Sequence, residues 1–208
     1  MKMHIQSRTL LTGMAALFSL ACSGGSTAAG NGRMAIELTD APFPSDSVSR
    51  VDVFVVRVDA RVADADSATA TIGAPDDSAR VGGWTTLVRP NASVNLLAYQ
   101  NGAVLPLGDL SMPAGTYRGF RLVIDPSRSS LTLKNGAVLT NTSSPSISFP
   151  SAARSGIKIN LTTPVTVTAN RTTVVLVDFM VENSFVMRGN SISQNGLLFR
   201  PVVKATAR

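Results

Sequence analysis

Three carboxylates, Asp125, Asp178 and Glu182, are the residues of this chain whose type suits acid–base chemistry. A glycoside hydrolase uses two carboxyl groups that face each other across a cleft. The spacing of these three residues does not require that any two of them face each other. We therefore expect that the protein is not an enzyme, and a carboxylate-based hydrolase is the third hypothesis for its function.

Asp178 lies in a predicted strand, 172–182, on the face that it shares with two apolar side chains. A buried carboxylate needs a cation or several hydrogen-bond donors. Arg121 is the preferred partner, because its planar guanidinium can hold a carboxylate through two bonds. Lys158 and the backbone amides near Ser184 are the alternatives. The sequence thus predicts a structural ion pair here.

Two Asp residues lie one or two positions before a proline. Asp40 precedes Ala41-Pro42 at a strand end, and Asp125 directly precedes Pro126. An Asp in a turn usually accepts hydrogen bonds from nearby backbone amides, so we expect structural caps.

A polar stretch at 63–82 carries the only candidate metal ligands. Its spacing does not match an EF-hand loop, so a long loop without metal is expected and calcium is the weaker alternative. The candidate calcium ligands are Asp64, Asp66, Asp76 and Asp77.

The N-terminus has the pattern of an export signal. Lys2 and Arg8 make its start positive, and the mostly apolar residues 10–21 are fewer than the ~20 that span a membrane. The segment ends in Ser19-Leu20-Ala21-Cys22, which resembles the lipobox of bacterial lipoproteins, where the Cys is lipidated and becomes the first mature residue. The alternative is an ordinary secretory signal and a chance Cys.

The lipobox divides the chain into three parts. Residues 1–21 form a signal peptide, lipidated Cys22 tethers the protein to a membrane, and 23–32 form a flexible linker rich in Gly and Ser. Ser23 rather than Asp after the Cys favours the outer membrane of a Gram-negative cell. The folded domain is expected over 33–208.

Loss of the signal peptide also restricts the chemistry. It removes His4, the only His, and leaves Cys22 as the only Cys. Catalysis by Ser-His-Asp or Cys-His is therefore excluded, as are ordinary zinc and copper sites, and no cofactor is expected. The remaining Lys and Arg residues are scattered among few aromatics, so nucleic acid is not an expected partner.

The domain has the pattern of an all-β protein. Short β-branched runs alternate with turn residues, which predicts a single antiparallel β-sandwich. In the strand at 50–62 the apolar alternation changes phase near Phe54, which indicates a β-bulge or a centre buried on both faces. Three Asn-Gly pairs, at 101–102, 135–136 and 195–196, favour type I′ hairpins. Strands are predicted at 33–39, 50–62, 83–88, 93–99, 103–107, 115–125, 130–134, 137–140, 156–162, 164–169, 172–182, 184–188 and 197–206.

Trp84 is the one residue that suggests sugar binding. A carbohydrate-binding module needs exposed aromatic platforms, and Trp84 follows two Gly residues at a strand start. A core position is the preferred interpretation, because a lone Trp is often the largest core side chain of a domain.

Several strings resemble, in order, the domain-of-unknown-function family 4382 of bacterial and archaeal envelope lipoproteins. The resemblance covers nearly all of 33–208 and implies a surface location and a β-sandwich, but no activity. The chain departs from the family at Met180, where a second acidic residue is usual, and at its Phe199-Arg200-Pro201 ending. The strings are Leu38-Thr39-Asp40-Ala41-Pro42, Val51-Asp52-Val53-Phe54-Val55, Pro113-Ala114-Gly115-Thr116-Tyr117 with Arg121-Leu122, Pro150-Ser151 with Ser155-Gly156-Ile157-Lys158, Val177-Asp178-Phe179 with Ser184, and Arg200-Pro201-Val202-Val203.

Together these patterns predict an envelope-anchored lipoprotein. Its β-sandwich is expected to bind or scaffold an envelope or extracellular ligand without catalysis. A carbohydrate-binding module is the second hypothesis.

Overall fold

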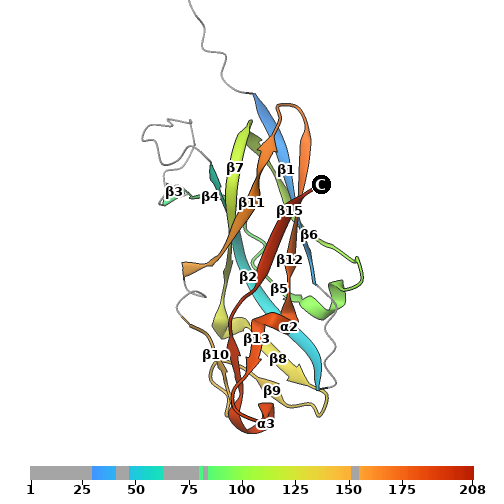
Figure 1. Cartoon of the computed structure of the whole chain (residues 1–208), viewed down its shortest axis with the longest axis vertical. Coiled ribbons are helices and arrows are strands. Elements are labelled where there is room, and N and C mark those ends of the chain that lie inside the picture. Colours follow the sequence, from blue (N-terminus) through green and yellow to red (C-terminus); the bar gives the residue numbers. More distant parts are fainter. Residues whose placement is uncertain (1–29, 41–46, 63–79, 82–83, 151–154) are drawn as a thin grey trace, which may run out of the picture.

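The computed structural model describes residues 30–40, 47–62, 80–81, 84–150 and 155–208 (Figure 1). It confirms the β-sandwich, although two strand pairs, β1 with β12 and β10 with β14, are parallel. The four-stranded sheet has the order β15 (Val203–Ala207), β12 (Thr172–Phe179), β1 (Asn31–Thr39), β6 (Leu105–Pro113).

The larger sheet has eight strands. Its main path is β11 (Ile157–Val167), β7 (Gly115–Ile124), β2 (Val48–Val62), β4 (Trp84–Val88) and β3 (Arg80–Val81). Pairing along β2 and β8 adds β5 (Ala92–Asn95), β8 (Ser130–Leu133) and β9 (Val138–Leu139).

A third, small sheet has the order β10 (Ile147–Ser148), β14 (Leu197–Phe199), β13 (Phe185–Met187). Short helical turns flank it, α2 (Val181–Ser184) and α3 (Ile192–Asn195). Two 3₁₀ turns, η2 (Leu96–Tyr99) and η3 (Pro126–Arg128), complete the described elements.

Alternation of side chains along the strands builds the core. In β1, Met34, Ile36 and Leu38 are all buried, because every second residue of a strand faces the same way. Phe179 on β12 and Phe120 on β7 are fully buried in the same apolar cluster. Each such side chain contributes roughly 1.5–3 kcal/mol by leaving water.

The phase change in β2 has both predicted causes. The pairing of β2 with β7 shifts register between Val55 and Arg57, so the strand contains a bulge. Three consecutive residues, Val53, Phe54 and Val55, are also buried, which means that the strand centre is covered on both faces.

Several predicted strand boundaries are wrong. The strand expected at 93–99 ends at Asn95 and continues as η2, while the one expected at 172–182 ends at Phe179 before α2. The segments 156–162 and 164–169 form one strand, β11, whose pairing with β7 shifts register between Asn160 and Val165. The strand expected at 197–206 is interrupted at 200–202.

The Asn-Gly pairs do not all adopt the predicted turn. Asn101 and Gly102 both have positive φ, 57° and 87°, as a type I′ turn requires, but the preceding β5 and the following β6 belong to different sheets. At 135–136 only the glycine has positive φ. Asn195 ends α3, with Gly196 as its cap at φ 73°.

The molecule is elongated, with distinct ends (Figure 1). β1 starts at one end, and the opposite end, here called the distal end, carries the three-stranded sheet, α3 and the β8–β9 hairpin. Among the residues described, no helix is long and apolar enough to cross a membrane.

Candidate functional site

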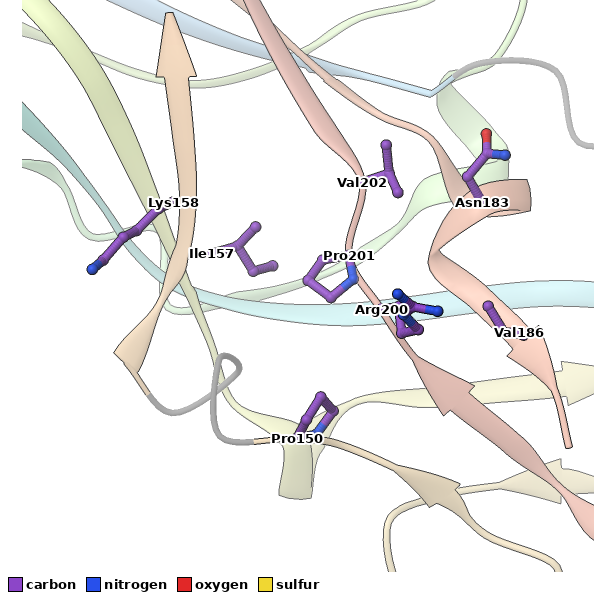
Figure 2. A pocket seen from close by; sticks show the side chains of 8 residues that line it. All are labelled: Pro150, Ile157, Lys158, Asn183, Val186, Arg200, Pro201 and Val202. Atoms are coloured by element: carbon purple, nitrogen blue, oxygen red, sulfur yellow. The ribbon is translucent and has the colours of Figure 1, made fainter.

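A groove of about 460 Å³ lies beside the three-stranded sheet (Figure 2). The start of β11, α2, β13 and the segment between β14 and β15 meet there. Figure 2 shows Ile157 and Pro201 turned toward each other across it, with Arg200 beside them. The lining residues are Pro150, Ile157, Lys158, Asn183, Val186, Arg200, Pro201 and Val202.

One buried serine holds the wall at 200–202 in place. The carbonyl of Ser184 accepts the N–H of Arg200 at 2.7 Å, and its hydroxyl accepts the N–H of Val202 at 2.9 Å. The same hydroxyl donates to the carbonyl of Met180 at 2.7 Å. Pro201 has no N–H, so the strand breaks here and the serine supplies the missing pairing.

Asp40 fixes the start of α2, on which Asn183 lies. It is 3% exposed, and its Oδ1 accepts the backbone N–H of Val181 at 3.1 Å, while Oδ2 accepts from Nε2 of Gln100 at 3.1 Å. The predicted cap therefore exists, but its target is distant in sequence. Asp125 caps locally as expected, because its Oδ1 accepts the N–H of Ser127 at 2.9 Å.

The groove combines aliphatic walls with positive charge. Val186 and Val202 are 40% and 37% exposed. Lys158 and Arg200 are also exposed, and neither forms an ion pair within the described part of the chain. No Asp or Glu is among the described residues that line the groove, so this lining suits an apolar ligand with negative charge.

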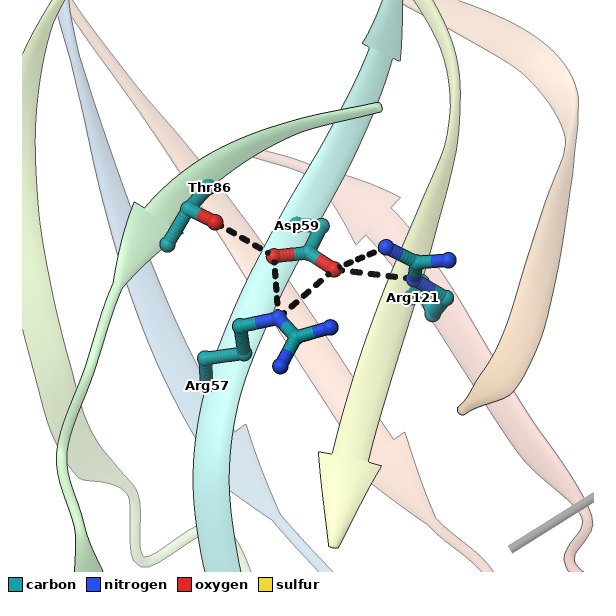
Figure 3. A network of polar contacts seen from close by, with 4 residues as sticks. All are labelled: Arg57, Asp59, Thr86 and Arg121. Atoms are coloured by element: carbon teal, nitrogen blue, oxygen red, sulfur yellow. Dashed lines mark hydrogen bonds and ion pairs between the residues drawn. The ribbon is translucent and has the colours of Figure 1, made fainter. Parts of the chain in front are cut away.

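A second polar cluster lies on the eight-stranded sheet (Figure 3). Asp59 is 1% exposed, and its Oδ2 accepts from Nε and Nη2 of Arg121 at 2.8 and 2.6 Å. Its Oδ1 accepts from Nε of Arg57 at 3.1 Å and from Oγ1 of Thr86 at 2.9 Å. This carboxylate is fully satisfied, as burial of a charge requires.

Arg121 is held from two further sides. Its Cζ lies 4.9 Å from the centroid of the Trp84 ring, a cation–π distance. Gly156, with φ of 88°, packs so closely that a Cβ there would lie 2.5 Å from Cγ of Arg121. Trp84 is half-buried under this guanidinium, so the structure makes it part of the cluster and not an open platform.

The predicted partners of Asp178 are wrong. Arg121 pairs with Asp59, Lys158 is exposed, and neither contacts Asp178 among the residues described. The N–H of Ser184 bonds to the carbonyl of Met180 instead. Asp178 is half-buried on β12, opposite Thr39 of β1 and Lys204 of β15. The sequence pattern that indicates the observed ion pairs of Asp59 is the alternation of Arg57 and Asp59 along β2.

The carboxylates proposed for hydrolysis do not share the groove. Asp125 caps η3, and Glu182 is exposed on α2. In the described ranges no cluster of His, Cys, Asp and Glu could hold a metal ion. Cys22 and the candidate calcium ligands Asp64, Asp66, Asp76 and Asp77 lie outside those ranges.

Comparison with known proteins gives one match. The family model described as domain of unknown function (DUF4382) matches residues 31–201. No curated protein and no solved structure matches the chain. Most of the groove lining comes from the strings that carry this resemblance: Pro150, Ile157, Lys158, Arg200, Pro201 and Val202.

Proposed function

Because the chain belongs to the DUF4382 family, whose description assigns no activity, we propose that it is a non-catalytic binding module of the cell envelope. In this proposal lipidated Cys22 anchors the module, and the groove lined by residues 150, 157, 158, 183, 186 and 200–202 is its binding site.

The composition of the groove carries the proposal. Exposure of aliphatic side chains to water costs free energy, and large exposed patches of them mark binding sites. Four of the five large exposed hydrophobic residues in the described ranges lie in the groove or elsewhere at the distal end; the fifth, Leu110, lies on β6. The four are Val138, Val186, Met187 and Val202.

The position of the groove supports an anchored module. β1 starts at the end of the molecule opposite the three-stranded sheet (Figure 1). A lipid on Cys22 would be joined to Asn31, the first residue of β1, by only residues 23–30. The groove would therefore face away from the membrane, toward ligands.

No observation favours the other two hypotheses. Trp84 carries Arg121 on its ring, which gives the carbohydrate-binding hypothesis no support. The described lining of the groove contains no carboxylate, and hydrolysis by a pair of carboxyl groups needs two.

Site-specific photo-crosslinking in the cell of origin tests the binding site. A photoreactive amino acid replaces Val186 in the groove or, as control, Leu110 on β6; the two side chains are similarly exposed, 40% and 37%. Crosslinks to an envelope component should form from position 186 and not from 110. Equal crosslinking from both positions would remove the groove from the proposal.

Membrane fractionation tests the anchor. Cys22→Ser should abolish lipid labelling and release the protein from the membrane or leave the precursor uncleaved. A Cys22→Ser variant that still partitions with the detergent phase like the wild type would contradict the anchor.

A further inference from the structure

β13 is an edge strand of the three-stranded sheet. The carbonyl of Ser184 and the N–H of Arg188 bond to the chain around β14 at 2.7 and 3.1 Å. Because bonding alternates along a strand, Phe185 and Met187 turn their backbone groups away from β14. The N–H of Phe185 bonds to Val181 in α2. Within the described residues, the carbonyl of Phe185 and both backbone groups of Met187 have no partner.

Hollows flank this edge on both faces. Val186 lines the groove, and Met187 lines a second hollow of about 430 Å³. Successive side chains of a strand point to opposite faces, so the two hollows lie on opposite sides of β13. The second hollow is lined by Ser47, Leu133, Lys134, Asn135, Met187, Asn190, Ser191, Ile192 and Ser193.

The charged side chains that line the two hollows or directly follow β13 are all positive. Lys158 and Arg200 line the groove, Lys134 lines the second hollow, and Arg188 directly follows β13. All four are exposed and form no ion pair with a described residue. Among the described residues, neither hollow has an Asp or Glu in its lining.

We infer that β13 binds an extended acidic segment of a partner protein as an added strand. This inference rests on the proposed function and names its ligand class. In such binding, main-chain hydrogen bonds supply affinity, and hollows for alternate side chains supply specificity. The partner's main chain bonds to Met187 and Phe185. Its successive side chains enter the groove and the second hollow, and its carboxylates meet the four cations.

The same features argue against other occupants. A second copy of this chain would bring its own Arg188 and Arg200 against the cations of the first, and like charges across a strand pair are destabilising. The groove walls are Pro, Val and Ile rather than the exposed aromatics on which sugars stack.

Fluorescence anisotropy with the full-length protein in neutral detergent tests the inference. The probe is a fluorescein-labelled ten-residue peptide of alternating Val and Glu. Binding should saturate below millimolar peptide. A peptide with Lys in place of Glu should bind at least tenfold more weakly. Two further peptides are N-methylated, one on every Val and the other on every Glu. At least one of them should bind at least tenfold more weakly, because an added strand needs the N–H groups along one of its edges.

Protein variants locate the binding. Arg200→Glu and Val186→Asp should each weaken binding of the Val-Glu peptide about tenfold. Arg118→Glu is the matched control, because Arg118 is an exposed arginine on β7 that forms no ion pair with a described residue, and it should leave binding unchanged. Thermal melts verify that each variant is folded.

Several outcomes would overturn the inference. They are no binding of the Val-Glu peptide, full binding of both N-methylated peptides, binding of alginate in place of the peptide, or a stable dimer whose formation blocks the peptide. If position 186 still crosslinks in the cell but the Val-Glu peptide does not bind, the proposed binding module is supported and the inference of an added strand is wrong.

Discussion

The polar cluster around Asp59 on the eight-stranded sheet and the distal end of the molecule use the same kinds of side chain in opposite ways. In the first, Arg57 and Arg121 both bond to buried Asp59, and Arg121 also covers Trp84. At the distal end, cations such as Arg188 and Arg200 stand without ion pairs to described residues.

This difference separates charge that stabilises the fold from charge available to a ligand. A buried carboxylate must keep its cations, because losing one partner leaves the other charged and desolvated. An exposed cation is hydrated and contributes little to stability. Binding sites are therefore best sought where exposed cations adjoin exposed aliphatic side chains.

The largest expected effect is in the cluster. Asp59→Ala should lower the free energy of unfolding by about 3–5 kcal/mol, because two guanidinium groups lose their carboxylate in a mostly buried site. Urea denaturation measures it. Asp109→Ala is the control, because Asp109 pairs with Arg33 at 2.6 Å where both side chains are about half exposed, and it should cost far less. Equal losses of unfolding free energy in the two variants would contradict the proposed contrast between buried and exposed charges.

Asp40 links the end of β1 to the start of α2 beside the groove, and its removal should have an intermediate effect. Asp40→Ala leaves the N–H of Val181 without the acceptor seen here, which should cost about 1–3 kcal/mol. Because α2 carries Asn183, crosslinking from position 186 should also decrease. An unchanged groove in a destabilised variant would show that α2 keeps its place without Asp40.

Tyr117 tests whether the stability of the β-sandwich also depends on a buried side chain that must stay uncharged. Burial raises the pKa of Tyr117 above its ordinary value, since the charged form is disfavoured. Its stabilising contribution is therefore complete below about pH 10, the ordinary tyrosine value, and is lost as pH rises through the raised pKa. Tyr117→Phe should cost about 1 kcal/mol at pH 7, because the hydroxyl donates to Pro113 at 2.9 Å.

Urea denaturation between pH 7 and 11 follows this dependence. The wild type should lose stability above pH 10 more steeply than Tyr117→Phe. Parallel profiles would show that Tyr117 ionises without cost to the fold.

The smallest effect belongs to the distal end. Arg200→Glu should change the free energy of unfolding by less than about 0.5 kcal/mol, because Arg200 is exposed and has no ion pair among the described residues. The same urea experiment measures it. A loss close to that of Asp59→Ala would mean that the distal charges are structural.

Local patterns in the sequence predict the sandwich well. Alternation and turn residues place most strands, and the phase change in β2 predicts its bulge. They fail where distant residues decide the outcome. β12 ends before α2, whose first N–H bonds to Asp40, 141 positions away, and no pattern near Phe179 carries that information.

The candidate site was predicted only in parts. The apolar neighbours of Asp178 predict a pair with Arg121. Arg121 instead lies opposite Asp59, because β7 pairs with β2 beyond the register shift near Arg57. Pro150, Lys158 and Arg200 all lie in strings noted for their resemblance. Their convergence into one groove depends on the path of β11 and the break after β14, which the strings do not encode.

The place of β1 in its sheet has a consequence for the order of folding. β1 is the first described strand, yet Arg33 lies between Ser111 of β6 and Thr172 of β12. In a chain that emerges from its N-terminus, one side of this strand must stay unpaired until β12 has followed, which is most of the sequence. Unpaired apolar strands invite association with other chains. On the face opposite its buried residues, β1 carries Arg33 and Glu37. Such charges oppose association of the unpaired strand with another chain.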